Sequence, residues 1–194
     1  MAGNIKKIGV LALQGAYLEH INILSKLNCQ VITVKKTKEL ENLDGLILPG
    51  GESTTIGKMM EEYNFIIPIK EKANSGMGIM GTCAGLILLA NKVKGGNKSY
   101  LQLIDIEVER NAYGRQIESF EEEIMIPELG INSFPAVFIR APQILSIRDE
   151  VVVLARYKDE IVLARQGGIL VSAFHPELTD DTRIHQYFLE MLSI

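Results

Sequence analysis

The first half of the chain alternates short apolar runs with segments of mixed polarity. Each run is almost wholly apolar, which is typical of strands that are buried on both faces. The runs cover residues 8–13, 31–34, 46–48 and 77–80. Strands of this kind belong to parallel sheets, in which the connecting helices cover both faces.

The segments between these runs have helical spacing. Apolar residues recur every three positions in the first such segment, at Leu18, Ile21, Leu24 and Leu27. This spacing predicts one face of a helix, and a second helical pattern begins at Ile56. The alternation of strand and helix predicts an α/β fold, with an open, mostly parallel sheet and helices on both faces.

The second half of the chain changes character. Its apolar segments are separated by short polar or glycine turns, which predicts antiparallel hairpins in the C-terminal half. These segments are residues 151–157, 161–166 and 169–174. A final helix is predicted after the capping residues 179–181, with Ile184, Phe188 and Met191 facing inward.

Composition narrows the class of protein. The 194 residues, 47% of them hydrophobic, suffice for one core but not for two ordinary domains, so residues 1–194 are expected to form a single domain. The net charge of −4 argues against nucleic acid or an anionic membrane as partner. No apolar stretch approaches the ~20 residues of a membrane span. Two cysteines make no disulfide framework, and a cytoplasmic location is expected.

Residues 76–85, GMGIMGTCAG, contain two overlapping motifs. The first glycines match the dinucleotide fingerprint G-x-G-x-x-G, but they lie before and within the predicted strand, and no acidic residue follows about 20 positions later. The last five residues match the nucleophile elbow G-x-S-x-G with Cys83 in place of serine, between a strand and a helix. The helix dipole there favours a thiolate. A free cysteine is most often a core residue, as predicted for Cys29, but the flanking glycines favour a nucleophile at Cys83.

Three histidines are candidates for the base that a cysteine nucleophile needs. His175 ends a strand, and Pro176 favours an extended backbone there. Residues two apart then point to the same side, so Glu177 can orient the imidazole. Without Cys83, an ordinary hydrogen-bonded histidine would be an equal interpretation. His185 is predicted to lie on the surface of the final helix, and the spacing of His20 indicates no role.

Two backbone N–H groups are candidates for an oxyanion hole, those of Ala84 and of Gly51. Gly51 belongs to a glycine turn after the third strand. The same loop resembles a P-loop only loosely, because five residues instead of four separate its glycines and Met59 replaces the serine or threonine that binds Mg²⁺. No histidine pair or cysteine cluster has metal-ligand spacing, so neither a metal nor another cofactor is predicted.

Several stretches carry a family resemblance: GVLALQGAYLEH, LPGGESTTIGK, GTCAGLILLA, RNAYGRQ, FIRAP and FHPELTDDTRIHQYF. Together they resemble the glutaminase subunits of pyridoxal 5'-phosphate synthases, which are class I glutamine amidotransferases of flavodoxin-like fold. The resemblance runs from Gly9 to Phe188 without a departure at a motif position. The cysteine elbow and His-x-Glu are shared by all class I members, whereas LQGA-x-x-EH, RNAYGRQ and FIRAP are specific to this subunit.

The resemblance implies that Cys83, His175 and Glu177 hydrolyse L-glutamine to glutamate and ammonia. The implied glutamine pocket consists of Gly51, Glu52, Ser53, Arg110, Ile139 and Arg140. An arginine there suits the α-carboxylate of glutamine, although sequence alone would make either arginine a solvated surface charge. Ammonia would pass to a barrel-shaped pyridoxal 5'-phosphate synthase subunit in a hetero-oligomer. The partner contact is expected near Gln14, Glu19 and His20.

Two other classes of function remain open on the sequence. A related thiol hydrolase or peptidase would act on larger γ-glutamyl or peptide substrates. A non-catalytic binding module would keep the fold alone, but the intact Cys83, His175 and Glu177 argue against it. Within the family, RNAYGRQ and FIRAP disfavour glutaminases that deliver ammonia to other synthases.

Overall fold

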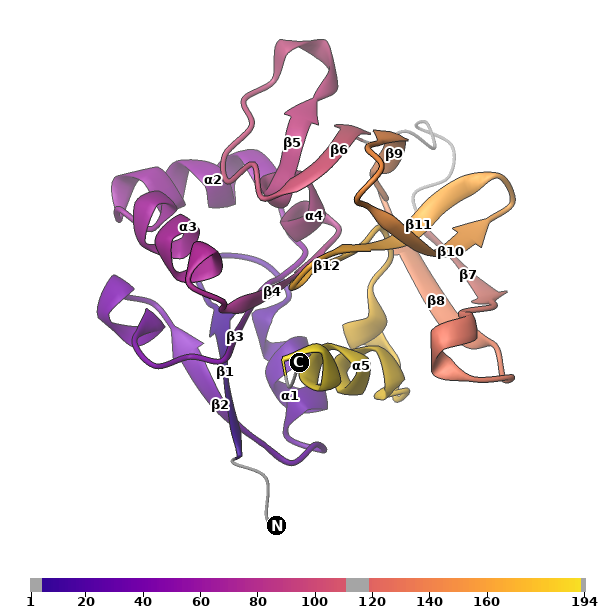
Figure 1. The fold of residues 1–194 in the computed structure, drawn as a ribbon, viewed down its shortest axis with the longest axis horizontal. Coiled ribbons are helices and arrows are strands. Elements are labelled where there is room, and N and C mark those ends of the chain that lie inside the picture. Colours follow the sequence, from indigo (N-terminus) through magenta and orange to yellow (C-terminus); the bar gives the residue numbers. More distant parts are fainter. Residues whose placement is uncertain (1–4, 111–118, 193–194) are drawn as a thin grey trace.

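A ten-stranded sheet and a separate two-stranded sheet form the framework of the protein (Figure 1). The computed structural model describes residues 5–110 and 119–192. The strands are β1 (Lys6–Leu11), β2 (Cys29–Val34), β3 (Gly45–Leu48), β4 (Gly78–Thr82), β5 (Ala90–Val93), β6 (Ile104–Glu109), β7 (Ser119–Ile124), β8 (Phe134–Ile139), β9 (Gln143–Ile147), β10 (Val152–Tyr157), β11 (Glu160–Gln166) and β12 (Ile169–Ser172). The large sheet has the order β2-β1-β3-β4-β12-β11-β9-β6-β5, with β10 paired to β11.

The N-terminal half of the large sheet is parallel, as the apolar runs predict. Strands β2, β1, β3, β4 and β12 all run in the same direction. Their order is that of flavodoxin-like folds, in which ligands bind beyond the carboxyl ends of the strands, where the strand order reverses. The carboxyl ends of β3, β4 and β12 are therefore the first place to look for a site.

Helices cover both faces of this parallel part. They are α1 (Tyr17–Leu24), α2 (Ser53–Glu62), α3 (Ile66–Asn74), α4 (Ala84–Leu89) and α5 (Arg183–Met191), with the short 3₁₀ helices η1 (Thr37–Leu40), η2 (Lys94–Gly96), η3 (Pro127–Leu129) and η4 (Pro176–Leu178). Helices α1 and α5 lie on one side of β3 and β4, and α2, α3 and α4 lie on the other (Figure 1). Within the described ranges, no helix is long and apolar enough to cross a membrane.

The buried face of α1 differs from the predicted one. Leu18 is 58% exposed, and Leu27 lies beyond the end of the helix. The buried residues of α1 are His20, Ile23 and Leu24. The prediction was correct for Leu24 and wrong for Leu18 and Leu27. Apolar spacing does not reveal that His20 faces inward, because its buried polar partners come from other parts of the chain.

The C-terminal half confirms the predicted hairpins. Strands β10 and β11 are antiparallel, and so are β11 and β12. Strand β12 also pairs in parallel with β4, with Ser172 opposite Thr82. This pairing brings the residues after β12 next to the residues after β4, although about ninety positions separate them in the sequence.

The final helix α5 packs its predicted residues inward. Ile184, Phe188 and Met191 are all buried. His185 is buried with them and has no exposed surface, so its predicted place on the surface is wrong. The backbone N–H of Arg183 donates to the carboxylate of Asp181 at 3.0 Å, in line with the predicted capping segment, although Thr182 is the N-cap residue.

Candidate active site

Cys83 occupies a strained turn between β4 and α4. Its φ of 49° and ψ of −99° lie outside the regions that L-residues favour, as expected of a nucleophile elbow. Such a conformation costs on the order of 1–3 kcal/mol and is retained where surrounding structure imposes it. The flanking glycines permit the turn, because a Cβ on Gly85 would lie 2.1 Å from the carbonyl oxygen of Leu48. Helix α4 begins at Ala84, two residues earlier than the apolar run Leu86–Ala90 suggests.

His175 and Glu177 make the contact that their spacing predicts. Nδ1 of His175 lies 2.7 Å from Oε1 of Glu177, and both side chains are buried. His175 also lies against Gly50 after β3: a Cβ on Gly50 would lie 2.4 Å from Cε1 of His175 and 3.6 Å from Cβ of Cys83. The segments that follow β3, β4 and β12 therefore meet at the side chains of Cys83 and His175. Only glycine fits at position 50, because any side chain there would collide with the imidazole ring of His175.

The charges at this point favour a protonated His175 beside an ionised carboxylate. Burial alone lowers the pKa of His175, but hydrogen bonds with Cys83 and Glu177 outweigh it and raise that pKa from 6.5 to about 10. Burial works against the charge of Glu177, yet the neighbouring His20 and His175 keep its pKa below the usual value.

A cavity of about 470 Å³ opens over Cys83 and His175. Every residue of the predicted glutamine pocket lines it: Gly51, Glu52, Ser53, Arg110, Ile139 and Arg140. The guanidinium of Arg110 donates to the hydroxyl of Thr54 at 2.7 Å, and its buried Nε atom has no hydrogen-bond partner among the described residues. The remainder of the RNAYGRQ motif lies outside the described residues.

The glycine turn after β3 is attached to the loop after β1. The carbonyl oxygen of Gly50 accepts a hydrogen bond from the backbone N–H of Ala16 at 2.9 Å. The amide oxygen of Gln14 accepts one from the backbone N–H of Glu52, also at 2.9 Å. The Glu52 carboxylate caps α2 through the N–H groups of Thr54 and Thr55. The LQGA segment therefore braces the loop that carries the candidate oxyanion donor at Gly51.

The structure corrects one residue of the expected partner contact. Gln14 and Glu19 are partly exposed, as a contact surface requires. His20 is completely buried, so it is not available to a partner. Instead, Nε2 of His20 lies 3.1 Å from the Thr82 hydroxyl and 3.5 Å from Oε2 of Glu177. Sequence reasoning missed this position beside the site, although the histidine of LQGA-x-x-EH was a signal for it.

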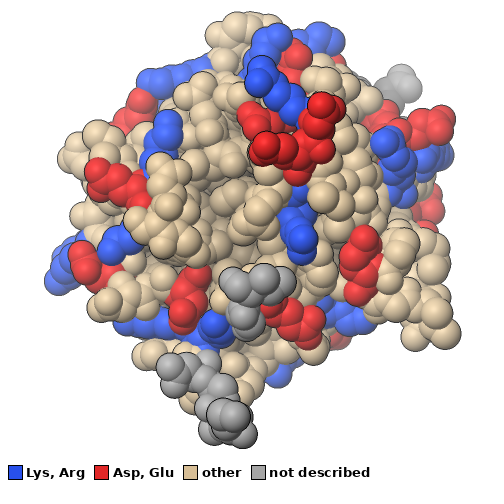
Figure 2. Space-filling model, in the orientation of Figure 1, with Lys and Arg blue, Asp and Glu red and all other residues tan. Residues whose placement is uncertain are grey.

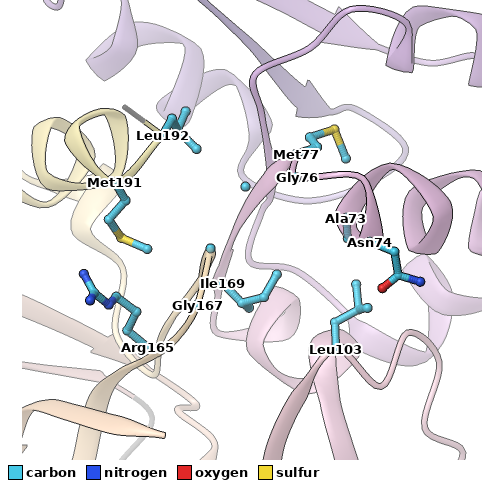
Figure 3. Close-up of a pocket in the computed structure, with 12 residues that line it drawn as sticks. Ala73, Asn74, Gly76, Met77, Leu103, Arg165, Gly167, Ile169, Met191 and Leu192 are labelled. Carbon is cyan, nitrogen blue, oxygen red and sulfur yellow. The ribbon is translucent and has the colours of Figure 1, made fainter. Parts of the chain in front are cut away.

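A second cavity, of about 450 Å³, opens at the amino ends of β4 and β12 (Figure 3). Its lining is mainly glycine and apolar side chains such as Met77, Ile169 and Met191. Arg165 is its charged residue, and it donates to the Tyr187 hydroxyl at 3.0 Å.

Over the face shown in Figure 2, basic and acidic side chains alternate and neither forms a continuous surface.

The fold is that of the glutamine amidotransferases. A crystal structure described as a glutamine amidotransferase matches it with a TM-score of 0.91 and 47% identity, over 96% of this chain and 99% of that one. The structure of PurLQS from Thermotoga maritima, at 17% identity and a TM-score of 0.74 over 97% of this chain and 99% of that one, shares the fold.

The chain belongs to the SNO glutamine amidotransferase family, whose model matches residues 10–194. Two similar proteins are both called pyridoxal 5'-phosphate synthase subunit PdxT. The protein of Desulforamulus reducens is 55% identical over 95% of this chain and 98% of its own. The protein of Carboxydothermus hydrogenoformans is 51% identical over 95% of this chain and 96% of its own.

Proposed function

We propose that this chain is the glutaminase subunit of a pyridoxal 5'-phosphate synthase. It hydrolyses L-glutamine with Cys83 as nucleophile, His175 as acid and base, and Glu177 as the group that orients His175. The observation that carries the proposal is the convergence of these three side chains below a cavity that two arginines line. The assignment to a pyridoxal 5'-phosphate synthase is supported by the names of the two PdxT relatives.

The first half of the reaction starts with a proton on His175. The Cys83 thiolate attacks the side-chain amide carbon of glutamine, and the carbonyl oxygen becomes an oxyanion. The backbone N–H groups of Ala84 and Gly51 stabilise that charge. When the tetrahedral intermediate collapses, the carbon–nitrogen bond breaks, and the His175 imidazolium gives its proton to the leaving nitrogen. The products are ammonia and a γ-glutamyl thioester on Cys83.

The second half reverses the role of His175. The neutral imidazole takes a proton from water, and the resulting hydroxide attacks the thioester carbon. The carbon–sulfur bond then breaks, which releases glutamate and restores the Cys83 thiolate beside the His175 imidazolium. Throughout, the 2.7 Å contact keeps the Glu177 carboxylate on Nδ1, so that Nε2 carries the proton that moves.

The cavity suits a small amino acid with an α-carboxylate. Its volume of about 470 Å³ is at the small end of the range for ligand sites. Arg110 and Arg140 line it together with the nucleophile, and guanidinium groups bind carboxylates through paired hydrogen bonds. Glutamine held in this way has its side-chain amide at the cysteine. Arginines have no such role in a peptidase for ordinary α-linked peptides, whose substrate lacks a free α-carboxylate near the scissile bond, whereas a γ-glutamyl substrate shares this carboxylate with glutamine.

Ammonia release tests the proposal. The chain is mixed with the synthase subunit from the same cell. Ammonia and glutamate are measured from free glutamine, and glutamate is measured separately from a γ-glutamyl peptide, whose hydrolysis releases an amino acid or peptide in place of ammonia. We expect release from glutamine only, and none from Cys83→Ala, whose fold is checked by circular dichroism. Release from the peptide alone would instead support the thiol peptidase.

A further inference from the structure

A row of buried polar side chains continues behind Glu177, away from the cavity. Nε2 of His20 lies 3.5 Å from Oε2 of Glu177, and Nδ1 of His20 lies 3.0 Å from Nε2 of His185. His20 and His185 have no exposed surface. They come from α1 and α5, the two helices on one side of the sheet (Figure 1). Buried polar groups destabilise a fold unless they are hydrogen-bonded, so this row requires a specific arrangement of protons.

Both histidines of the row are neutral at neutral pH. Burial, together with the charge of neighbouring His175, lowers the pKa of His20, although Glu177 and Glu19 act in the opposite direction. Burial and the proximity of His20 lower the pKa of His185 to about 3. Each ring therefore has one N–H donor and one nitrogen lone pair.

Only one of the two possible proton arrangements suits the surroundings. If His20 donated from Nδ1 to His185, its Nε2 lone pair would face the Glu177 carboxylate. His185 would then carry a buried N–H at Nδ1 for which the described part of the chain offers no acceptor. In the opposite arrangement, His185 donates from Nε2, and His20 donates from Nε2 towards Thr82 and Glu177. The atom left without a partner is then only a lone pair on Nδ1 of His185, which is the smaller penalty.

Thr82 completes the connection to the carboxylate. Its hydroxyl lies 3.1 Å from Nε2 of His20 and 3.5 Å from Oε1 of Glu177. It accepts from the histidine and directs its own hydrogen to the carboxylate. Within residues 5–110 and 119–192, the buried Oε2 of Glu177 has no hydrogen-bond partner at standard distances, so His20 at 3.5 Å is the donor that faces it. Without His20, nothing in this row would hold that oxygen in place.

We propose that His20 is a positioning residue for the reaction: its Nε2–H group, directly and through Thr82, holds the Glu177 carboxylate against His175, and His185 fixes the tautomer of His20. The inference rests on the proposed function, because it concerns the same three side chains. His20 does not line the cavity over Cys83. Its loss should therefore change turnover and leave glutamine affinity nearly unaltered.

Paired substitutions at position 20 test this role. His20→Gln keeps an amide N–H near the place of Nε2–H, whereas the shorter His20→Asn does not reach it. The control is Ile23→Ala, which weakens the same buried face of α1 and removes no polar group of the row. Two quantities are measured: the pKa of His175 by ¹⁵N nuclear magnetic resonance on the chain, and kcat and KM for ammonia release in the presence of the synthase subunit.

We expect His20→Asn to lower the His175 pKa from about 10 by about one pH unit or more, because the carboxylate no longer faces the imidazolium steadily. It should lower kcat by about tenfold or more, with KM within about twofold. His20→Gln should restore most of both values. Ile23→Ala should lower the melting temperature and leave the His175 titration unchanged.

Three results would overturn the inference: an unchanged His175 titration in His20→Asn, equal behaviour of the asparagine and glutamine variants, or the same titration shift in Ile23→Ala. Failure of the proposed function looks different. In that case the unsubstituted chain releases no ammonia from glutamine, while the His175 titration still distinguishes His20→Asn from His20→Gln.

Discussion

The Sγ atom of Cys83 lies 3.8 Å from the carbonyl oxygen of Ile139, although 56 positions separate the two residues in the sequence. The FIRAP segment at the end of β8 therefore reaches the elbow itself. Arg140, the next residue, has a positive φ of 44° and lines the same cavity. This contact places the FIRAP segment and the sulfur of Cys83 at one cavity.

Selective alkylation should identify the nucleophile. We expect a glutamine analogue with a diazo-ketone group to label Cys83, which lines the cavity, and to leave Cys29 unmodified. Burial raises the pKa of Cys29, so that thiol is also a poor nucleophile at neutral pH. Peptide mass mapping after digestion gives the site. An adduct on Cys29 alone would exclude Cys83 as the nucleophile.

Substitutions of His175 and Glu177 should differ in severity. His175→Asn removes the acid and base and should abolish most turnover, by about 10³-fold or more. Glu177→Gln keeps the base but loses the negative charge on Nδ1, so its loss of kcat should be smaller. Steady-state ammonia release with the synthase subunit present measures both. A glutamine variant as inactive as the asparagine variant would mean that Glu177 does more than orient the ring.

The arginines of the cavity should control affinity. Arg140→Met and Arg110→Met each remove a guanidinium from the proposed carboxylate site, and we expect each to raise KM for glutamine by about tenfold or more with a smaller effect on kcat. Arg156→Met is the matched control, since Arg156 is an exposed residue of β10 that donates to the backbone oxygen of Asp159. Equal KM values for all three variants would contradict the proposal that Arg110 and Arg140 bind the α-carboxylate of glutamine.

The synthase subunit should stimulate the glutaminase. The Gly50 carbonyl is bonded to Ala16, and glycines at positions 50 and 51 let the peptide between them reorient with little steric cost. A partner that contacts Gln14 and Glu19 is therefore able to favour the peptide orientation in which the Gly51 N–H points to the oxyanion. Such a shift between the two orientations requires a difference in binding free energy of about a few kcal/mol. Ammonia release at saturating glutamine, with and without synthase, measures the effect. An isolated chain with the full rate would refute this coupling and leave the glutaminase proposal intact.

Stability should fall in mild acid because of the buried histidines. The pKa of His185 is lowered from 6.5 to about 3, so the unfolded chain binds a proton below pH 6.5 that the folded chain excludes. The free energy of unfolding is then complete above pH 6.5 and decreases as pH falls towards 3, by about 1.4 kcal/mol per pH unit and per such group. Urea denaturation between pH 7 and 5 measures this slope. His185→Gln should make it shallower, and an unchanged slope would contradict the buried neutral state.

The strand and helix pattern was readable from the sequence because local sterics and burial determine it. Apolar runs such as residues 46–48 are long enough only for strands buried on both faces, and β3 confirms this. The elbow at Cys83 was readable too, since its glycines satisfy a steric demand within five residues. His175 and Glu177 meet because their separation of two positions is also local.

The pairing of strands that are distant in the sequence could not be predicted from the sequence. This pairing determines which of the locally predicted features come together in the fold. The parallel pairing of β12 with β4 sets His175 beside Cys83, and the cavity gathers Arg110 and Arg140 from separate loops. The sequence misassigned His185 because a polar side chain in a helix favours the surface unless a buried partner is present, and the resemblance placed His20 at the partner contact. The two histidines are each other's buried partners, 165 positions apart, and only the packing of α1 and α5 on one face of the sheet brings them together.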